Sequence, residues 1–302
     1  MLRPSRLLLT FLLGMGTASV APSARLMASS QRKAGAAEKS AQHATLRPVA
    51  ATAPDIPFEP FDSAAERQLL QLANKARAQA GAPPLALDEG LSQAARVHAQ
   101  AMLEAQQLSH QFDGEPPLVQ RLATGTHLQL DQEGENVALD FDPEQAQRHL
   151  MLSPPHRANL LNPAYNVVGL GVVRGGDRLY VVQDFGHALP NYSAAQMKDR
   201  IAATVSEARR QAKQPDLARR DLPTADAAAC TMAQVDKLGT SPIQQLAQRY
   251  TVLTFTSLNP TLPAGANGAI TSPKLRSFSV GACYARTQTY PTGVYWVLLS
   301  LD

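Results

Sequence analysis

Apolar side chains recur at helical spacing in two successive stretches where the patterned part of the chain begins. We expect Asp62 or Ser63 to cap the first helix and Gly81 to end it, since two prolines follow closely. Asp88 should open the second helix, and His98 falls on its apolar face, so we expect His98 to lie in the core. The apolar positions are Leu69, Leu70, Ala73, Ala76 and Ala80 in the first helix, and Leu91, Ala94, Ala95 and Met102 in the second.

A third helix is predicted further along the chain. Pro143 suits the first turn of a helix, because the N–H that proline lacks would have no intrahelical partner there. Two consecutive prolines from Pro154 should stop this helix, which would place His156 where the helix passes into a loop. Between the second and third helices, we expect Gly134 to free the backbone of a loop just before Glu135.

Two strand-like runs follow, at 166–174 and 178–185. The glycines and aspartate at 175–177 between them are a strong hairpin signal. The order of helix, helix, polar loop, helix and hairpin lacks the alternation of strands and helices that a doubly wound nucleotide-binding fold requires. We therefore predict an α+β fold.

The first residues resemble an export signal in their pattern of charge and hydropathy. Arg3 and Arg6 precede an apolar run from Leu7 to Met15, which is too short to span a bilayer, and small residues follow it. We predict a signal peptide over 1–21 and a secreted or periplasmic protein with no transmembrane segment once the signal is removed. Residues 22–60 are rich in Ala, Ser, Pro and Gln, and we predict a disordered linker there.

Composition narrows the class of protein. The chain has 302 residues, 44% of them hydrophobic, and a net charge of +3, with no dense basic face. We therefore expect a globular protein that does not bind nucleic acid. Its two cysteines, Cys230 and Cys283, are an even number in a chain predicted to be exported, so we expect them to form a disulfide. Two buried free thiols are the alternative.

Candidate chemistry gathers at His110, Glu135 and His156, with Asn136 and Ser153 beside them in the sequence. Two imidazoles and a carboxylate can bind a divalent metal, orient a histidine as a general base, or form a buried polar network around a cleft. A serine–histidine arrangement is conceivable for Ser153 and His156. However, the chain has neither the G-x-S-x-G nor the H-E-x-x-H motif.

Six blocks of sequence occur in a family order. They are Asn74-x-x-Arg77, Leu91-x-x-Ala94-Ala95-x-x-His98, Ser109-His110, Gly134-Glu135-Asn136, Ser153-x-x-His156-Arg157-x-Asn159, and Val168-Gly169-x-Gly171 with the closing run from Tyr180 to Gly186. In this order the blocks resemble the CAP superfamily of cysteine-rich secretory, antigen 5 and pathogenesis-related proteins, and most closely its secreted, SCP-like bacterial branch. The resemblance implies an α-β-α sandwich of CAP type, which we expect over 61–190.

The resemblance also implies a cleft where the site residues meet. His110, Glu135 and His156 match three of the four polar positions of the family cleft, and Ser153 stands where animal members have a glutamate. A divalent metal such as zinc, held by His110 and His156, is one outcome that the family allows, and Ser153 leaves such a site without its second acid. Leu150 replaces the tryptophan that is usual in the family, and Pro155 replaces the usual glycine.

The family is known more for secretion and binding than for one reaction. The resemblance therefore implies a binding module for a lipid, a sterol, a cell-envelope component or a host ligand, with a cleft lined by His110, Asn136, Ser153, His156 and Glu135. The alternative is a metal-dependent or Ser/His hydrolase, similar to a peptidase, that uses the same cleft. An apolar groove would favour the first interpretation, and Ser153 within hydrogen-bond reach of His156 would favour the second.

The last part of the chain, 191–302, repeats fainter features of the first. Arg209 stands where Arg77 does, and Ala227-Ala228-x-Cys230 resembles the helix around His98, which would put Cys230 at the histidine's position. No counterpart of the cleft residues remains. We expect a smaller α+β domain, and two interpretations stay open: a degenerate CAP repeat, or an unrelated domain fastened by a disulfide.

Overall fold

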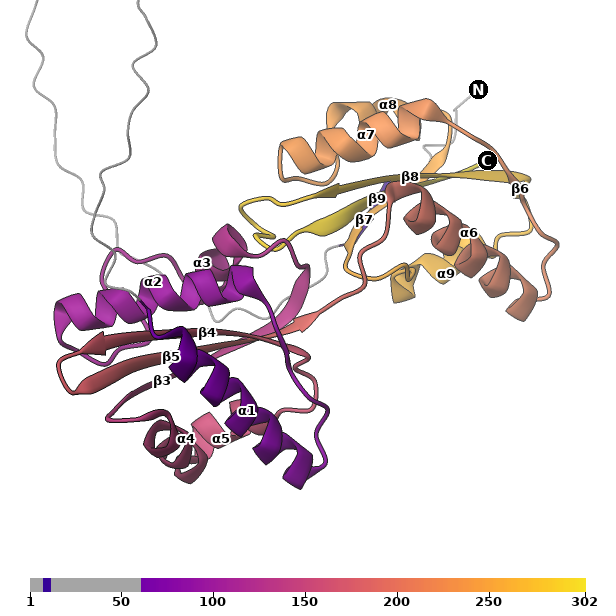
Figure 1. Ribbon diagram of the computed structural model, residues 1–302. Helices are drawn as coiled ribbons and strands as arrows, with labels where there is room; N and C mark the ends of the chain where they lie inside the picture. Colours follow the sequence, from indigo (N-terminus) through magenta and orange to yellow (C-terminus); the bar gives the residue numbers. More distant parts are fainter. Residues whose placement is uncertain (1–7, 12–60) are drawn as a thin grey trace, which may run out of the picture. The chain divides into compact units, whose positions relative to one another are not determined.

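The computed structural model describes residues 8–11 and 61–302 (Figure 1). The predicted linker over 22–60 and most of the predicted signal peptide lie outside the described residues. Within the signal segment, strand β1 (Leu8–Phe11) pairs in parallel with strand β7 (Thr251–Ser257). Export itself stays a prediction.

The first part of the chain is an α-β-α sandwich. Its sheet has the strand order β2-β4-β5-β3, with β2 parallel to β4 and the other pairs antiparallel. Helices α1, α4 and α5 pack on one face of this sheet, and α2 and α3 pack on the other (Figure 1). The elements are α1 (Ser63–Ala80), β2 (Ala86–Leu87), α2 (Glu89–Ala105), α3 (Leu118–Gly125), β3 (Leu130–Asp140), α4 (Pro143–Leu152), α5 (Pro154–Leu161), β4 (Val167–Gly175) and β5 (Arg178–Ala188).

The capping residues predicted for the first two helices are confirmed. The Asp62 carboxylate accepts a hydrogen bond from Ala65 N at 2.9 Å, and the Asp88 carboxylate accepts one from Leu91 N at 2.8 Å. Gly81 ends α1 with φ of 75°. His98 is fully buried, as its place on the apolar face of α2 predicts.

The loop predicted around Glu135 is wrong, because this segment lies inside the long strand β3. Glu135 pairs with Asp184 of β5 across the sheet. Gly134 is required by close packing and not by a turn, since a Cβ there would collide with the hydroxyl of Tyr165. That hydroxyl donates to Glu133 O at 3.0 Å. The polar residues of β3 that face the site interrupt the alternation of apolar and polar positions that marks a strand.

The position predicted for His156 at a helix exit is also wrong. Pro154 and Pro155 begin a new helix, α5, directly after α4 ends at Leu152. Ser153 lies between the helices with φ of −83° and ψ of 117°, an extended conformation that a residue before proline favours. Prolines suit the first turn of a helix as well as they end one, so His156 lies in the first turn of α5.

The second part of the chain repeats this layered arrangement. Its sheet has the order β1-β7-β9-β8-β6, with α6 and α9 on one face and α7 and α8 on the other (Figure 1). Without β1, that order matches β3-β5-β4-β2. The α+β fold class and a second sheet domain are thus confirmed. Its further elements are α6 (Ala194–Gln211), β6 (Ala218–Arg219), α7 (Pro223–Gln234), α8 (Ser241–Ala247), the 3-10 turn Ala264–Ala266, α9 (Asn267–Ile270), β8 (Ser277–Ala285) and β9 (Val294–Leu301).

Two buried arginines hold equivalent places in the two parts. Arg77 donates from Nε to Pro83 O at 2.6 Å, and its other nitrogens donate to the carbonyls of residues 160, 162 and 165. Arg209 donates from Nε to Pro215 O at 2.6 Å and from Nη1 to the carbonyls of residues 270 and 272. Both side chains are fully buried. These likenesses favour a degenerate repeat over an unrelated domain.

The alignment of Cys230 with His98 is wrong by two residues. Gly171 packs its backbone on Ala95 of α2, and Gly281 packs in the same way on Ala225 of α7. The left-handed residues that end the two helices, Gln106 with φ of 49° and Asp236 with φ of 50°, agree with this pairing. Ala228 therefore takes the helix position of His98, and Cys230 faces β8 from a position that is Gln100 in α2.

The disulfide between Cys230 and Cys283 is confirmed, with a Cα–Cα distance of 5.1 Å and a sequence separation of 53 residues. Closing a loop of this length restricts the unfolded chain, and the chain-entropy model gives about 4 kcal/mol of stabilisation. We therefore expect a reductant to lower the unfolding midpoint of the second part in calorimetry. A Cys230→Ser/Cys283→Ser variant should start from the lower midpoint and not respond to the reductant. An unchanged wild-type midpoint after complete reduction would contradict this.

Replacement of Arg77 tests how much its hydrogen bonds to backbone carbonyls stabilise the first part of the chain. Arg77→Met leaves buried carbonyl groups without donors, so we expect a loss of about 3 kcal/mol or more in the free energy of unfolding of the first part. Arg209→Met is the matched control and should affect the second part, by a smaller amount because Arg209 holds fewer carbonyls. Denaturant unfolding followed by hydrogen exchange assigns each loss of stability to the first or the second part of the chain. Equal amide protection of the first part in Arg77→Met and in wild type would contradict this role of Arg77.

Candidate functional site

The structure brings His110, Glu135 and His156 together from three separate elements. His110 follows α2, and its Nδ1 lies 2.8 Å from Glu135 Oε1 on β3. The ring centroid of His156, on α5, lies 6.2 Å from that of His110, with the rings tilted by 45°. The His110 side chain is 55% exposed, whereas that of Glu135 is 4% exposed. The buried carboxylate of Glu135 thus holds the accessible imidazole of His110 in place.

Arg121 of α3 holds the other side of Glu135. Its Nη2 donates to Glu135 Oε2 at 2.9 Å and to the backbone carbonyl of His110 at 3.1 Å. One buried guanidinium therefore fixes both the carboxylate and the main chain that carries the imidazole. No local pattern in the sequence indicates that the Arg121 side chain reaches the site.

His98 orders the segment that leads into the site. Its Nε2 donates to Ser109 O at 2.9 Å, and its Nδ1 lies 2.6 Å from Glu115 Oε1. The second oxygen of Glu115 accepts from Phe112 N at 3.1 Å. Since a carbonyl only accepts, Nε2 is the donor in the contact with Ser109. His98 thus fixes the residue before His110 without reaching solvent.

Two asparagines join α5 to β3. Asn159 Nδ2 donates to Glu135 O at 3.1 Å and to Asn136 Oδ1 at 3.0 Å. Asn136 Nδ2 donates in turn to His156 O at 3.1 Å and to Gln183 Oε1 at 3.2 Å. Asn136 is fully buried, so it acts through His156 and Glu135 and does not offer a contact of its own to a ligand.

Asp184 is a second buried acid behind the site. It is fully buried and is the cross-strand partner of Glu135. Burial raises the pKa of Asp184 well above its usual value, and the neighbouring Glu135 charge raises it further, against a smaller opposing effect of Arg121. The folded protein therefore favours the protonated form of Asp184, and Glu135 is the acid of the pair that His110 and Arg121 contact.

His156 and Ser153 do not form a nucleophile and base in this structure. Burial lowers the pKa of His156, and the nearby His110 lowers it further, so the His156 ring is uncharged at neutral pH. Ser153 is half-buried between α4 and α5, and no hydrogen bond joins its hydroxyl to His156 within residues 61–302. The serine–histidine arrangement has no geometric support.

The donor set at the site falls short of a zinc centre. Zinc sites in proteins use at least three protein ligands. Glu135 already binds His110 and Arg121 through its two oxygens, which leaves only the imidazoles of His110 and His156. Within the described part of the chain, no three His, Cys, Asp or Glu side chains are arranged to hold a metal ion. The residues at the site therefore do not fit a zinc ion.

The raised pKa of Asp184 makes stability depend on pH in a defined direction. The folded state keeps a proton that the unfolded chain loses above about pH 3.8, so wild-type stability falls as pH rises from there toward the folded pKa. Asp184→Asn mimics the protonated acid and removes this loss. We expect the variant to melt at a higher temperature than wild type at pH 7, with the difference shrinking toward pH 4. Asp113→Asn, on the turn before α3, is the control. A difference that does not change with pH would contradict this.

Several known proteins are similar to part of this chain. The family model described as Cysteine-rich secretory protein family, CAP, matches residues 70–185. YkwD of Bacillus subtilis (strain 168) is 33% identical over 117 residues, which are 38% of this chain and 44% of that protein. The membrane protein YlbC of the same strain is 33% identical over 132 residues, 43% of this chain and 37% of that protein. The chain thus spans less than half the length of these relatives.

Among solved structures, an extracellular protein with an SCP domain from Bacillus anthracis str. Ames is 29% identical in sequence. The match covers 41% of this chain and 40% of that chain, with a TM-score of 0.37. The residues that the family model matches include His110, Glu135 and His156. Residues 70–185 of the chain form a domain of the cysteine-rich secretory protein, or CAP, family.

Proposed function

We propose that the chain acts outside the cytoplasm as a binding module whose ligand docks against the rings of His110 and His156. The observation that carries this proposal is the orientation of His110, an exposed ring held by the buried pair of Glu135 and Arg121. A ring fixed before the ligand arrives loses little conformational entropy on binding.

The chemistry of the two rings favours a ligand rich in hydroxyl groups. Glu135 Oε1 lies 2.8 Å from His110 Nδ1, so Nε2 is the nitrogen of this exposed ring that is left for a ligand. His156 is uncharged at neutral pH and supplies a second imidazole 6.2 Å away, measured between ring centroids. Two imidazole rings at this spacing suit hydrogen bonds with the hydroxyl groups of a sugar. We therefore propose a cell-envelope glycan, such as peptidoglycan, over the lipid, sterol and host ligands.

The location rests on the predicted export signal and on the character of a relative. The similar protein from Bacillus anthracis is described as extracellular. Of the helices between residues 61 and 302, none combines the length and apolar character that a membrane crossing requires.

A hydrolase remains the second candidate because of the His110–Glu135 pair. A histidine whose Nδ1 is bound by a carboxylate has the arrangement of a general base, with Nε2 directed at the substrate. In this alternative His110 would activate water, since Ser153 has no hydrogen bond to either ring within the described residues.

Co-sedimentation of the full chain with isolated peptidoglycan tests the proposal. Each lost hydrogen bond is worth about 0.5–1.5 kcal/mol, so His110→Ala and His156→Ala should each weaken binding about two- to tenfold. His149→Ala is the matched control, because His149 is 60% exposed and lies 2.9 Å from the Asp140 carboxylate. This control should bind like wild type.

Three outcomes separate the candidates. Equal binding by His110→Ala, His149→Ala and wild type would exclude the site. If the chain sediments with phospholipid vesicles and not with peptidoglycan, the ligand is a lipid and not a glycan. Release of soluble fragments from peptidoglycan by wild type, but not by His110→Ala, would establish the hydrolase.

A further inference from the structure

A small pocket of about 210 Å³ lies at the start of β8 and the end of β9 in the second part of the chain. Three buried serines line it, Ser277 and Ser279 of β8 and Ser300 of β9, with exposures of 2%, 4% and 3%. Their side chains lie on the sheet face that α7 and α8 cover, since Cys283 and Leu298 share that face by the alternation of each strand and pack there. The pocket thus has a floor of hydroxyl groups.

Ser279 takes the place that Gly169 has in the first part. Each lies two residues before the glycine that packs on the covering helix, Gly171 in the first part and Gly281 in the second. A Cβ added to Gly169 would lie 2.2 Å from the backbone of Leu91, in the first turn of α2. Ser279 carries a side chain at the same place, so the second part lacks the backbone that covers this position in the first.

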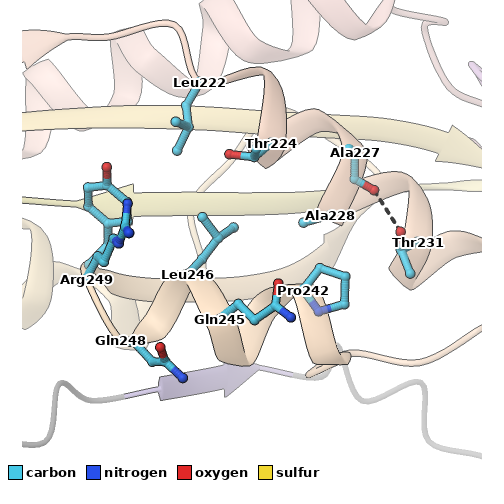
Figure 2. A pocket seen from close by; sticks show the side chains of 11 residues that line it. Leu222, Thr224, Ala227, Ala228, Thr231, Pro242, Gln245, Leu246, Gln248 and Arg249 are labelled. Carbon is cyan, nitrogen blue, oxygen red and sulfur yellow. Dashed lines mark hydrogen bonds between the residues drawn. The ribbon is translucent and has the colours of Figure 1, made fainter.

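Helix α7 begins too late to cover Ser279. Helix α2 begins six residues before Ala95, whereas α7 begins only two residues before Ala225, the equivalent residue. Figure 2 shows this start of α7, with Leu222 just before the helix and Thr224 in its first turn. The pocket therefore lies where the missing turn would be.

The floor of the pocket offers hydrogen bonds that the protein does not use. The Ser279 hydroxyl is buried without a partner, and neither the Ser277 nor the Ser300 hydroxyl has one among residues 61–302. A buried hydroxyl without a partner costs free energy, so this floor suits a ligand that brings acceptor atoms. The start of α7 favours a negative group as well, because no side chain caps the helix at Leu222.

Charged side chains of both signs lie at the mouth of the pocket. Of the described residues that line it, Arg220 is the cation, Asp221 and Asp302 are acids, and all three are exposed. Neither Arg220 nor Asp221 forms an ion pair within the described part of the chain. A simple anion would meet more negative than positive charge here. A ligand that carries both signs can contact Arg220 and Asp221 together.

We propose that this pocket binds a small zwitterion, a free α-amino acid with a short side chain. Its carboxylate accepts hydrogen bonds from the serine hydroxyls and from Arg220, and its ammonium group donates to Asp221. Pockets for drug-sized ligands measure about 300–1,000 Å³, so a pocket of about 210 Å³ suits a molecule of the size of alanine. This site is separate from His110 and His156 and does not rest on the function proposed for them.

Calorimetric titration of the full chain with alanine, propionate and alaninamide tests the two charges. Propionate lacks the ammonium group and alaninamide lacks the carboxylate, so alanine should bind about tenfold more tightly than either. Asp221→Asn should remove the preference for alanine over propionate, and Arg220→Gln should reduce the preference over alaninamide. Asp216→Asn and Lys274→Gln, exposed charges outside the pocket, are the matched controls and should keep both preferences.

Ser279→Ala separates a role in binding from a purely structural one. Loss of an unpartnered buried hydroxyl should raise the melting temperature of the protein without ligand, whereas the affinity for alanine should fall about two- to tenfold. A structural serine would change the melting temperature and leave the affinity unchanged. Absence of alanine binding by wild type, equal binding of alanine and propionate, or wild-type affinity in Ser279→Ala would each overturn the proposal. Arg220 and Asp221 are exposed, so their variants keep the test decisive if Ser279→Ala does not fold.

Discussion

The buried guanidinium of Arg77 is the contact on which the geometry of the site depends. It binds four backbone carbonyls, one just after α1 and three in the segment that ends α5 and leads to β4. Carbonyl groups at the end of a helix have no intrahelical donors, so a buried helix end needs a donor from elsewhere. Arg77 supplies it, which allows α5 to end inside the protein and to present His156 from its first turn.

A second cation, Arg121, does the same for the other half of the site. Glu135 would be costly to bury as an unpaired carboxylate, and Arg121 offsets that cost with a direct ion pair. Burial and the charge of Glu135 raise the pKa of Asp184, which disfavours a second negative charge beside Glu135. His110 therefore meets one well-defined carboxylate, and its ring has one favoured tautomer and orientation. The loop after α2, strand β3 and helix α3 are joined at this point.

Much of the fold can be predicted from the sequence, because capping residues and apolar stripes are local signals. Asp62, Asp88 and Gly81 mark helix ends through their own side chains or backbone. The strand around Glu135 was not predictable in this way, since its polar side chains serve the site and break the alternation. Proline is ambiguous as well, because it both ends helices and begins them, and His156 was misplaced for that reason.

Prediction of the site residues from the sequence is limited in the same way. Its outward residues, His110 and His156, could be found from their place in ordered blocks of sequence. The buried residues that orient them could not, because Arg121, Glu115 and Asp184 come from elements that meet only in the folded chain. The second part adds a related lesson. It has a similar sheet order and a buried arginine, and Ala228 stands at the helix position that corresponds to His98. A fold can therefore keep its buried arginine and its sheet order without the polar network around His98.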